Sequence, residues 1–387
     1  MSGSSSDAVA TEADRERLLL APYAMRASAS AGRVHAEPPH PYRNAFQRDR
    51  DRIVHSSAFR RLAHKTQVFI GEMGDYHRTR LTHTLEVASI ARTIGRSLRL
   101  HEDLIEALAL AHDIGHPPFG HAGEDVLDAC LHDRGGFNHN RQALRIVELL
   151  EIRYPSFPGL NLTRETLEGQ GARAKPAKAR GNAFAQSAEP CPAPPLLEVQ
   201  VVDASDSIAY DAHDADDAVE LGLLELADLD GAALWRESAA RVRRAYAALD
   251  PQQFRRAAVH EIIDRLVSDL LRHSSRLLAE AQFASVAEVR AAPRSVIGPS
   301  AEMVEQQREL ESLLFARVYR HPQVLDQRAR AAEALRAMFE QLVERPDRIP
   351  ERFRRTAADE GSHRAAADYL ACMTDRLALE TFARGGW

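Results

Sequence analysis

Residues 111–124, AHDIGHPPFGHAGE, gather metal-binding and proton-carrying side chains directly after an apolar run. Residues 104–111 (LIEALALA) are apolar almost all round, which predicts a buried helix that ends before Gly115 and the two prolines. His112 and Asp113 are therefore expected at an interior helix end. An unpaired carboxylate there would cost on the order of several kcal/mol, which a divalent cation would offset. The alternative is a hydrogen-bonded core histidine beside an aspartate at a helix end.

The composition indicates a cytoplasmic protein with no membrane partner. The chain has 387 residues, 44% of them apolar, which is enough for one large domain or two ordinary ones. Its net charge of -6 argues against a surface that binds nucleic acid everywhere, although a local basic groove remains an alternative. The three cysteines form no CxxC motif, so neither a disulfide framework nor a thiolate zinc site is expected. No apolar run reaches the roughly 18 residues of a membrane span, and the polar start lacks a signal peptide's apolar centre.

Two segments depart from a core-forming pattern. Residues 1–40 are rich in Ser, Ala, Pro and charge, which predicts a flexible N-terminal tail of which only residues 18–25 dock. Residues 41–387 are expected to form a single helical domain. Within it, residues 169–195 are rich in Gly, Ala, Pro, Lys and Arg and lack periodicity, so we expect a low-complexity surface insertion.

Helical periodicity runs through the remaining chain. After Arg80 and His83, apolar residues recur at helical spacing at Val87, Ile90, Ala91, Ile94 and Leu98. Further helices of ordinary length are expected at 232–249, 260–280, 302–319, 327–343 and 363–382. No run of alternating strands is found, so the fold class is predicted to be all-α.

Residues 43–65 carry a surplus of basic side chains, namely Arg43, Arg48, Arg50, Arg52, Arg60, Arg61 and Lys65. Such a cluster could meet the phosphates of a nucleotide or of single-stranded nucleic acid. The alternative is a solvated helix face with ion pairs within the helix. Nucleic acid is therefore only a secondary expectation.

Four side chains are predicted to hold a metal ion. His83 sits about one turn before the apolar stripe of its helix and can point inward toward His112 and Asp113. Further along, residues 203, 206, 210 and 213 share one helical face, and Asp203 has apolar neighbours that indicate partial burial. Two imidazoles and two carboxylates, from His83, His112, Asp113 and Asp203, suit Mg, Mn or another transition metal ion. Such an ion would have open positions for water and a substrate oxygen.

These blocks resemble a known family. The resemblance lies in RLTH (80–83), HDIGHPPFGHAGE (112–124), VVDASDSIAYDAHDADD (201–217), RDRDRIVHSSAFRRLAHKTQVF (48–69) and ADYLACMTDRLALE (367–380). Their order is similar to that of the HD superfamily, and within it to the deoxynucleoside triphosphate triphosphohydrolases of the dGTPase type. The resemblance implies an HD-domain helical fold with additional C-terminal helices. It also implies cleavage of dGTP or several dNTPs to the deoxynucleoside and inorganic triphosphate.

The resemblance further assigns roles to residues. It implies a metal site at His83, His112, Asp113 and Asp203, and a catalytic dyad of His121 and Glu124, whose i, i+3 spacing independently places both on one helical face. The implied substrate contacts are Gln67, Arg80, His116, Asp211 and Tyr319. Packing remains the alternative for His116, and a core position for Tyr319. A dNTP acting as allosteric activator and a homo-oligomer are also implied.

Two other functions remain open on the sequence. The first is an HD phosphohydrolase that acts on another nucleotide phosphoester or on single-stranded nucleic acid. The second, of a different class, is a catalytically silent nucleotide-sensing module. The silent module predicts lost ligand or dyad residues, whereas all of these positions are filled here.

Overall fold

The described part of the chain is built from helices. The computed structural model describes residues 12–67, 78–174 and 194–384. Within these ranges the only β pairing consists of isolated bridges, such as the one between Thr66 and Thr79. The predicted all-α fold is therefore confirmed. No helix in the described ranges is both long enough and apolar enough to cross a membrane.

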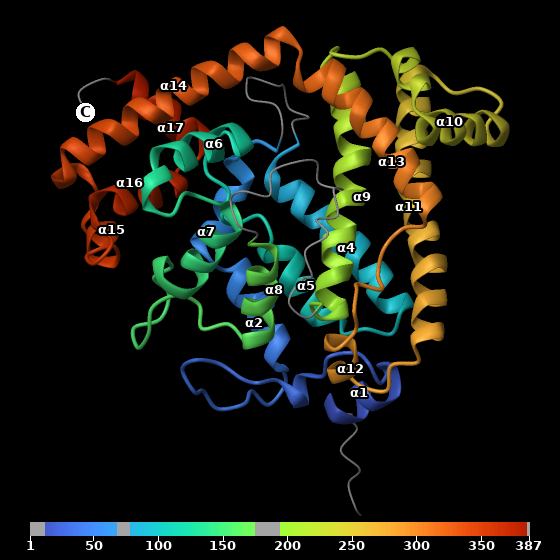
Figure 1. Cartoon of the computed structure of the whole chain (residues 1–387), viewed down its shortest axis with the longest axis horizontal. Coiled ribbons are helices and arrows are strands. Elements are labelled where there is room, and N and C mark those ends of the chain that lie inside the picture. Colours follow the sequence, from blue (N-terminus) through green and yellow to red (C-terminus); the bar gives the residue numbers. More distant parts are fainter. Residues whose placement is uncertain (1–11, 68–77, 175–193, 385–387) are drawn as a thin grey trace, which may run out of the picture.

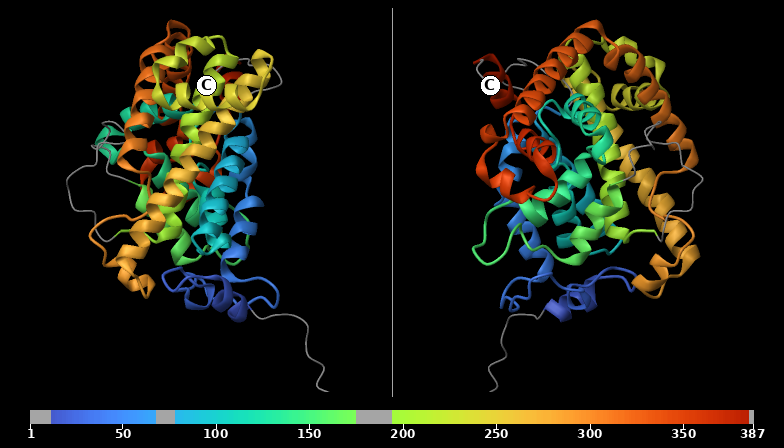
Figure 2. Two further views of the ribbon diagram at one scale, coloured as in Figure 1. Left: turned by 90° about the vertical axis from the view of Figure 1, so that its right-hand side faces the viewer. Right: turned by 60° about the vertical axis from the view of Figure 1, so that its left-hand side comes forward.

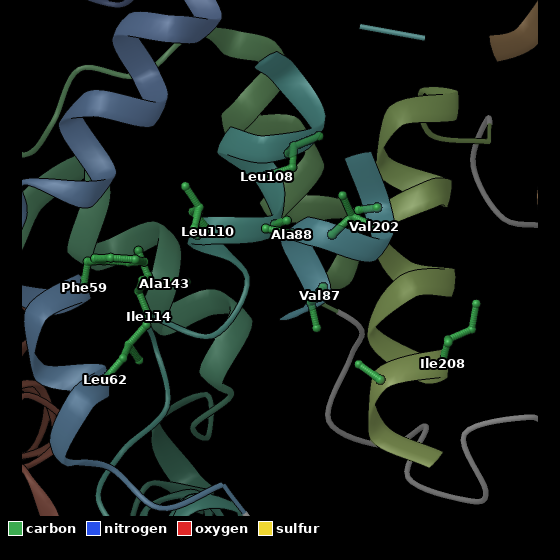
Figure 3. Packing of buried hydrophobic residues seen from close by; sticks show 14 of the residues in the cluster. Phe59, Leu62, Val87, Ala88, Leu108, Leu110, Ile114, Ala143, Val202 and Ile208 are labelled. Carbon is green, nitrogen blue, oxygen red and sulfur yellow. The ribbon is translucent and has the colours of Figure 1, made fainter. Parts of the chain in front are cut away.

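Three helices form the centre of the molecule (Figure 1): α4 (Arg80–Ser97), α5 (Glu102–Ala111) and α9 (Leu197–Glu220). Their apolar faces are largely buried, and Figure 3 shows Ala88, Leu108 and Val202 from the three helices coming together in this core. Burial of such side chains supplies the main stabilising free energy of the domain. The start of α4 and the end of α5 are consequently held in fixed positions.

The sequence explains where the central helices begin and end. Thr79 caps α4 by accepting a hydrogen bond from the Thr82 backbone, and the Thr82 hydroxyl pairs with the backbone of Thr79 in return. Helix α5 ends at Ala111, ahead of the turn that holds Gly115. A Cβ at Gly115 would collide with backbone atoms of His139. Glycine therefore allows the next helices to approach this turn closely.

Shorter helices surround the centre on one side: α2 (Ala45–Val54), α3 (Ser57–Arg61), α6 (Gly120–Cys130), α7 (His139–Arg145), the π-helical turn η4 (Ile146–Leu150) and α8 (Arg164–Arg173). Helix α2 packs on α5, and α8 packs on α5 and α7. The basic side chains of residues 43–65 are largely engaged within the protein. Arg52, for example, donates to the carbonyl oxygens of Leu160 and Asn161 and pairs with Glu37.

The C-terminal helices are α10 (Ala233–Ala245), α11 (Pro251–Ala281), α12 (Val286–Arg290), α13 (Ala301–Leu314), the π-helical turn η7 (Phe315–Tyr319), α14 (Pro322–Glu344), α15 (Glu351–Thr356), α16 (Gly361–Ala371) and α17 (Asp375–Ala383). In Figure 1, α10, α11 and α13 lie on the other side of the centre, whereas α15, α16 and α17 lie on the same side as α6 and α7. Helices α9 and α11 pack along each other, and α14 crosses from α13 to α16 and α17 (Figures 1 and 2). Helix α14 also packs on α6. The C-terminal helices thus reach back to the elements that follow α5.

Three segments differ from the sequence-based expectations. Beyond residues 18–25, which were expected to dock, more of the expected 1–40 tail has a defined place, because α1 (Glu12–Leu19) is helical and the His35 backbone donates to Asn161 Oδ1. The start of the expected 169–195 insertion is the end of α8, with Gly169 and Gln170 buried; residues 175–193 lie outside the described residues. The helix expected at 363–382 is two helices, because Thr374 caps a new one.

Candidate active site

Three of the predicted metal ligands meet at one point. His83 lies in the first turn of α4, and His112 and Asp113 follow the end of α5. One ligand atom from each residue lies within 4.8 Å of the other two, and all three residues are buried. The close packing of α4 on α5 brings the start of one helix beside the end of the other.

The fourth member of this cluster is Asp206, where Asp203 had been predicted. Asp206 Oδ1 lies 3.1 Å from His83 Nε2 and 3.6 Å from His112 Nε2. Asp203 instead pairs with Arg173, its Oδ1 lying 2.9 Å from Arg173 Nε. The two aspartates are three residues apart and lie close to the same side of α9. The rotation of α9 about its axis therefore decides which carboxylate reaches the histidines.

The imidazole nitrogens of the cluster are suited to binding a metal ion. His112 Nδ1 donates to Ala109 O at 2.6 Å, which leaves Nε2 unprotonated. This Nε2 is buried and has no hydrogen-bond partner among the described residues. On the other side, His83 Nδ1 lies 3.4 Å from His213 Nδ1, and His213 Nε2 lies 3.2 Å from Glu86 Oε2. Such a chain orients a ligating imidazole, and the N/O donor set fits a divalent ion.

Two arginines compensate the charge of the carboxylates. Arg80 Nη1 donates to Asp113 Oδ2, and Arg173 Nη2 donates to Asp206 Oδ2, each at 2.7 Å. Burial alone would raise the pKa of the Asp113 carboxyl, but His112 and Arg80 hold it well below its usual value. The pKa of Asp206 is likewise lowered, against the effect of burial, by His112 and Arg173. Both groups are therefore carboxylates at neutral pH, the form that binds cations.

A second cluster lies beside the first and contains the predicted dyad. His121 Nδ1 on α6 lies 3.2 Å from Glu124 Oε2. His139, the first residue of α7, places its own Nδ1 3.0 Å from the same oxygen and donates its backbone N–H to Glu124 Oε1. His116 stacks on His139 with ring centroids 3.9 Å apart, and its Nε2 lies 3.2 Å from Asp113 Oδ1. His116 thus connects the two clusters.

The surroundings of Glu124 and His116 give these two side chains different charges. Burial would raise the pKa of Glu124, but hydrogen bonds from His121 and His139 lower it far below its usual value. Glu124 is therefore an anion that accepts from the Nδ1–H groups, which leaves Nε2 of His121 to exchange protons. Burial lowers the pKa of His116 well below its usual value, so that imidazole is neutral. The side chain of His121 is 63% exposed, and that of His139 19%, so solvent reaches His121 more readily.

The predicted substrate contacts on α4 and before it lie around the metal-binding cluster. Arg80 Nη2 donates to the Gln67 carbonyl at 3.2 Å while Nη1 holds Asp113. The amide oxygen Oε1 of Gln67 is buried without a partner among the described residues. Gln67 therefore has an unused acceptor next to Arg80.

The other two predicted contacts differ in position. The Tyr319 hydroxyl lies 2.6 Å from that of Tyr210, which is one turn of α9 beyond Asp206. Asp211 does not join the site: it is fully buried, and its Oδ2 accepts from Gln307 on α13 at 2.7 Å. Five residues after Asp206, it is rotated by about 140° around the helix. Burial raises the pKa of Asp211 well above its usual value, which suits a protonated, structural group.

Sequence reasoning did not assign three residues that the structure places at the site: Asp206, His139 and Arg173. Asp206 was visible in the shared helical face of residues 203, 206, 210 and 213, but the spacing did not single it out. His139 opens a separate helix, and Arg173 lies in a segment without periodicity, so neither carried a local signal. Only the packing of α7 and α8 brings these two side chains to the clusters.

Comparisons with known proteins agree with this geometry. The HD domain matches residues 80–211, and the phosphohydrolase-associated domain matches residues 297–384. The deoxyguanosinetriphosphate triphosphohydrolase-like protein of Geobacter metallireducens is 42% identical over 370 residues, 96% of each chain. Its namesake in Parvibaculum lavamentivorans is 44% identical over 378 residues, covering 94% of this chain and 96% of that one. The chain belongs to this family of HD phosphohydrolases. The resemblance drawn from the motifs is thereby confirmed.

The two matched regions divide the site between them. The HD domain, residues 80–211, contains the side chains of both clusters, from His83 to Asp206. The phosphohydrolase-associated domain contributes Tyr319, and it also contains α16 and α17. HD domains are typically metal-dependent, and the His83, His112 and Asp113 group fits that property.

Proposed function

We propose that this HD phosphohydrolase cleaves dNTPs, either dGTP or several of them, to the deoxynucleoside and inorganic triphosphate with the help of a divalent metal ion. The observation that carries the proposal is the meeting of His83, His112, Asp113 and Asp206 around one point. The names of the two relatives, deoxyguanosinetriphosphate triphosphohydrolase-like proteins, support deoxyguanosine triphosphate as a substrate.

The four residues would hold the metal, and Asp206 takes the place first given to Asp203. A bound divalent ion would supply Lewis-acid activation of water and charge neutralisation on the phosphate. Arg80 orients the Asp113 carboxylate and also donates to the carbonyl oxygen of Gln67; we propose Arg80 and Gln67 as substrate contacts. Tyr319 and Tyr210 provide hydroxyl groups one turn further along α9.

His121 is the residue we assign to proton transfer. Hydrolysis at the α-phosphorus breaks its bond to the deoxyribose 5′ oxygen, which gains a proton, while the attacking water loses one. His121 can serve either transfer, since Glu124 holds its Nδ1 and leaves Nε2 for the exchange. His139 shares the same carboxylate and restrains it.

Product analysis tests the function. The protein, loaded with Mg²⁺ or Mn²⁺, is incubated with each dNTP singly and then with mixtures, and the products are separated by chromatography. We expect the deoxynucleoside and triphosphate in equal amounts, and no turnover by His112→Ala. Release of orthophosphate or pyrophosphate would contradict the proposal, because it would place the cleavage at another bond of the dNTP. No turnover of any dNTP would favour another nucleotide phosphoester as substrate.

The same experiment addresses regulation. Turnover that appears only in mixtures would support a dNTP as allosteric activator. We further propose a homo-oligomer that acts in the cytoplasm; the oligomer is tested by measuring the mass of the protein in solution with and without dNTPs.

A further inference from the structure

The junction between α16 and α17 is hydrogen-bonded to the loop that precedes α6, the helix that carries His121. Asp375, the first residue of α17, accepts the Phe119 backbone N–H on Oδ1 at 2.9 Å. Its Oδ2 accepts the Thr66 backbone N–H at 2.9 Å and the Thr66 hydroxyl as well. One carboxylate therefore joins two segments that are far apart in the sequence, directly before the first turn of α6.

Lys65 forms a second link at the same place. Its side chain is buried, and Nζ donates to the carbonyl oxygens of His116 at 2.5 Å and of Ala371 at 2.8 Å. Ala371 is the last residue of α16. Lys65, Thr66 and Asp375, which we call the C-terminal clamp, thus hold both ends of residues 116–119.

The held backbone needs such support. Phe119 has φ 65° and ψ 20°, a left-handed conformation that residues with a side chain rarely adopt. Phe119 occupies the N-cap position of α6, and its own backbone N–H donates to Asp375. This conformation sets the direction in which α6 leaves the loop, and His121 follows two residues later. A conformation of this kind persists only where its surroundings enforce it.

We propose that Asp375, with Lys65 and Thr66, is a positioning residue that aims His121 and Glu124 by fixing the backbone of residues 116–120. The inference rests on the proposed function and assigns the phosphohydrolase-associated region a part in catalysis. Asp375 touches no reacting group; it acts through Phe119.

Isosteric variants test the clamp. Asp375→Asn keeps the shape of the side chain but replaces one accepting oxygen by an NH₂ group. The amide therefore cannot accept from the backbone N–H groups of both Thr66 and Phe119. Thr66→Val removes the hydroxyl, and Thr66→Ser restores it. Glu380→Gln is the matched control, because Glu380 lies on the same helix and pairs only with Arg376 and Arg384 among the described residues.

Hydrogen exchange and steady-state kinetics are the two measurements. In Asp375→Asn and Thr66→Val we expect amides of residues 114–124 to exchange about tenfold faster, because a hydrogen bond to a charged group is lost. We expect kcat to fall by about 10- to 100-fold, since small displacements of a proton carrier are costly, with KM and metal content unchanged. Thr66→Ser and Glu380→Gln should behave like the unaltered protein.

Each contrary result overturns the proposal. Faster exchange with unchanged kcat would show that the loop need not be fixed, and a lower kcat with unchanged exchange would show that the clamp does not act through it. An equal fall of kcat in Glu380→Gln would show that any substitution in α17 lowers kcat, rather than the loss of the Asp375 hydrogen bonds. Exchange requires no turnover. If the unaltered protein were inactive on dNTPs, the proposed function would be contradicted, while the exchange result would still decide whether Asp375 and Thr66 fix the loop.

Discussion

At the scale of single residues, the structure places Asp206 beside the histidines, where the sequence had predicted Asp203. Substituting each aspartate in turn therefore tests the metal site directly. Asp206→Asn should weaken metal binding by about 100-fold or more, because even partners one step removed from a metal contribute 10- to 100-fold. Turnover should fall with it. Asp203→Asn should retain most of the metal, because Asp203 contacts Arg173 rather than the histidines. Elemental analysis after dialysis measures both, and the reverse order of losses would restore Asp203 as the ligand.

Substitution can also distinguish the roles of His121 and His139 in proton transfer. His121→Ala should leave metal content and stability nearly unchanged, since the side chain is 63% exposed, while turnover falls by roughly 10² to 10⁴-fold, the usual scale for a positioned acid or base. Glu124→Gln should act more mildly, because the proton carrier remains. Rates at saturating dNTP and metal analysis check this. Near-normal turnover by His121→Ala would move the proton-transfer role to His139.

At the scale of elements, helix α8 packs so closely on its neighbours that only glycine fits at one position. A Cβ at Gly169 would collide with side-chain atoms of Leu108 on α5 and Val199 on α9, whereas one at Gly171 would meet only Leu144 at 3.9 Å. Gly169→Ala should therefore destabilise the protein by about 1 to 3 kcal/mol through overpacking. Gly171→Ala should stabilise it by about 0.5 to 1 kcal/mol, because alanine is the better helix former.

Urea denaturation of the two glycine variants measures these opposite effects. Because the positions are two residues apart on one helix, differences in helix propensity cancel between them. If both variants were stabilised, the approach of α8 to α5 and α9 would be looser than the structure has it. Arg173, at the end of the same helix, would then also be less firmly placed beside Asp206.

The elements themselves could largely be predicted, because their signals are local. The apolar run of residues 104–111 and the glycine and prolines after it correctly indicated a buried helix that ends before Gly115; in the structure it ends at Ala111. The expected 302–319 helix was found, although its last turn is π-helical. The single helix expected at 363–382 was wrong, because a threonine inside an apolar pattern gives the same periodicity whether or not it caps a new helix.

The site could be predicted only where its residues share one element or a known motif. His112 and Asp113 are adjacent, and His121 and Glu124 are one turn apart, so the structure brings each pair together as expected. The position of Asp206 depends on how α9 is rotated against α4, and that of His139 depends on how closely α7 approaches Gly115. Both are set by packing between helices distant in the sequence, which no local pattern records.

At the scale of the whole molecule, Lys65 makes stability depend on pH in an unusual window. Burial lowers the pKa of Lys65 from 10.5 to about 7, with Arg61 and Arg80 acting in the same direction and Cys372 and Asp375 against it. A neutral amine still has two N–H groups, which match the carbonyl oxygens of His116 and Ala371. The native state therefore releases a proton from Lys65 that the unfolded chain keeps up to about pH 10.

The sign of the effect follows from proton binding. Below about pH 7 both states carry the proton, and the full cost of burying the charge is present. Between about pH 7 and 10 the unfolded state binds more protons, so Lys65 makes the free energy of unfolding rise with pH, by up to about 1.4 kcal/mol per unit. Lys65→Met lacks this contribution. Urea denaturation at pH 7, 8 and 9 measures the free energy of unfolding of both proteins. As the pH rises, this free energy should increase more in the unaltered chain than in Lys65→Met. The effects of the other titrating groups cancel in the comparison. A difference that stays constant would mean that Lys65 remains charged in the folded protein.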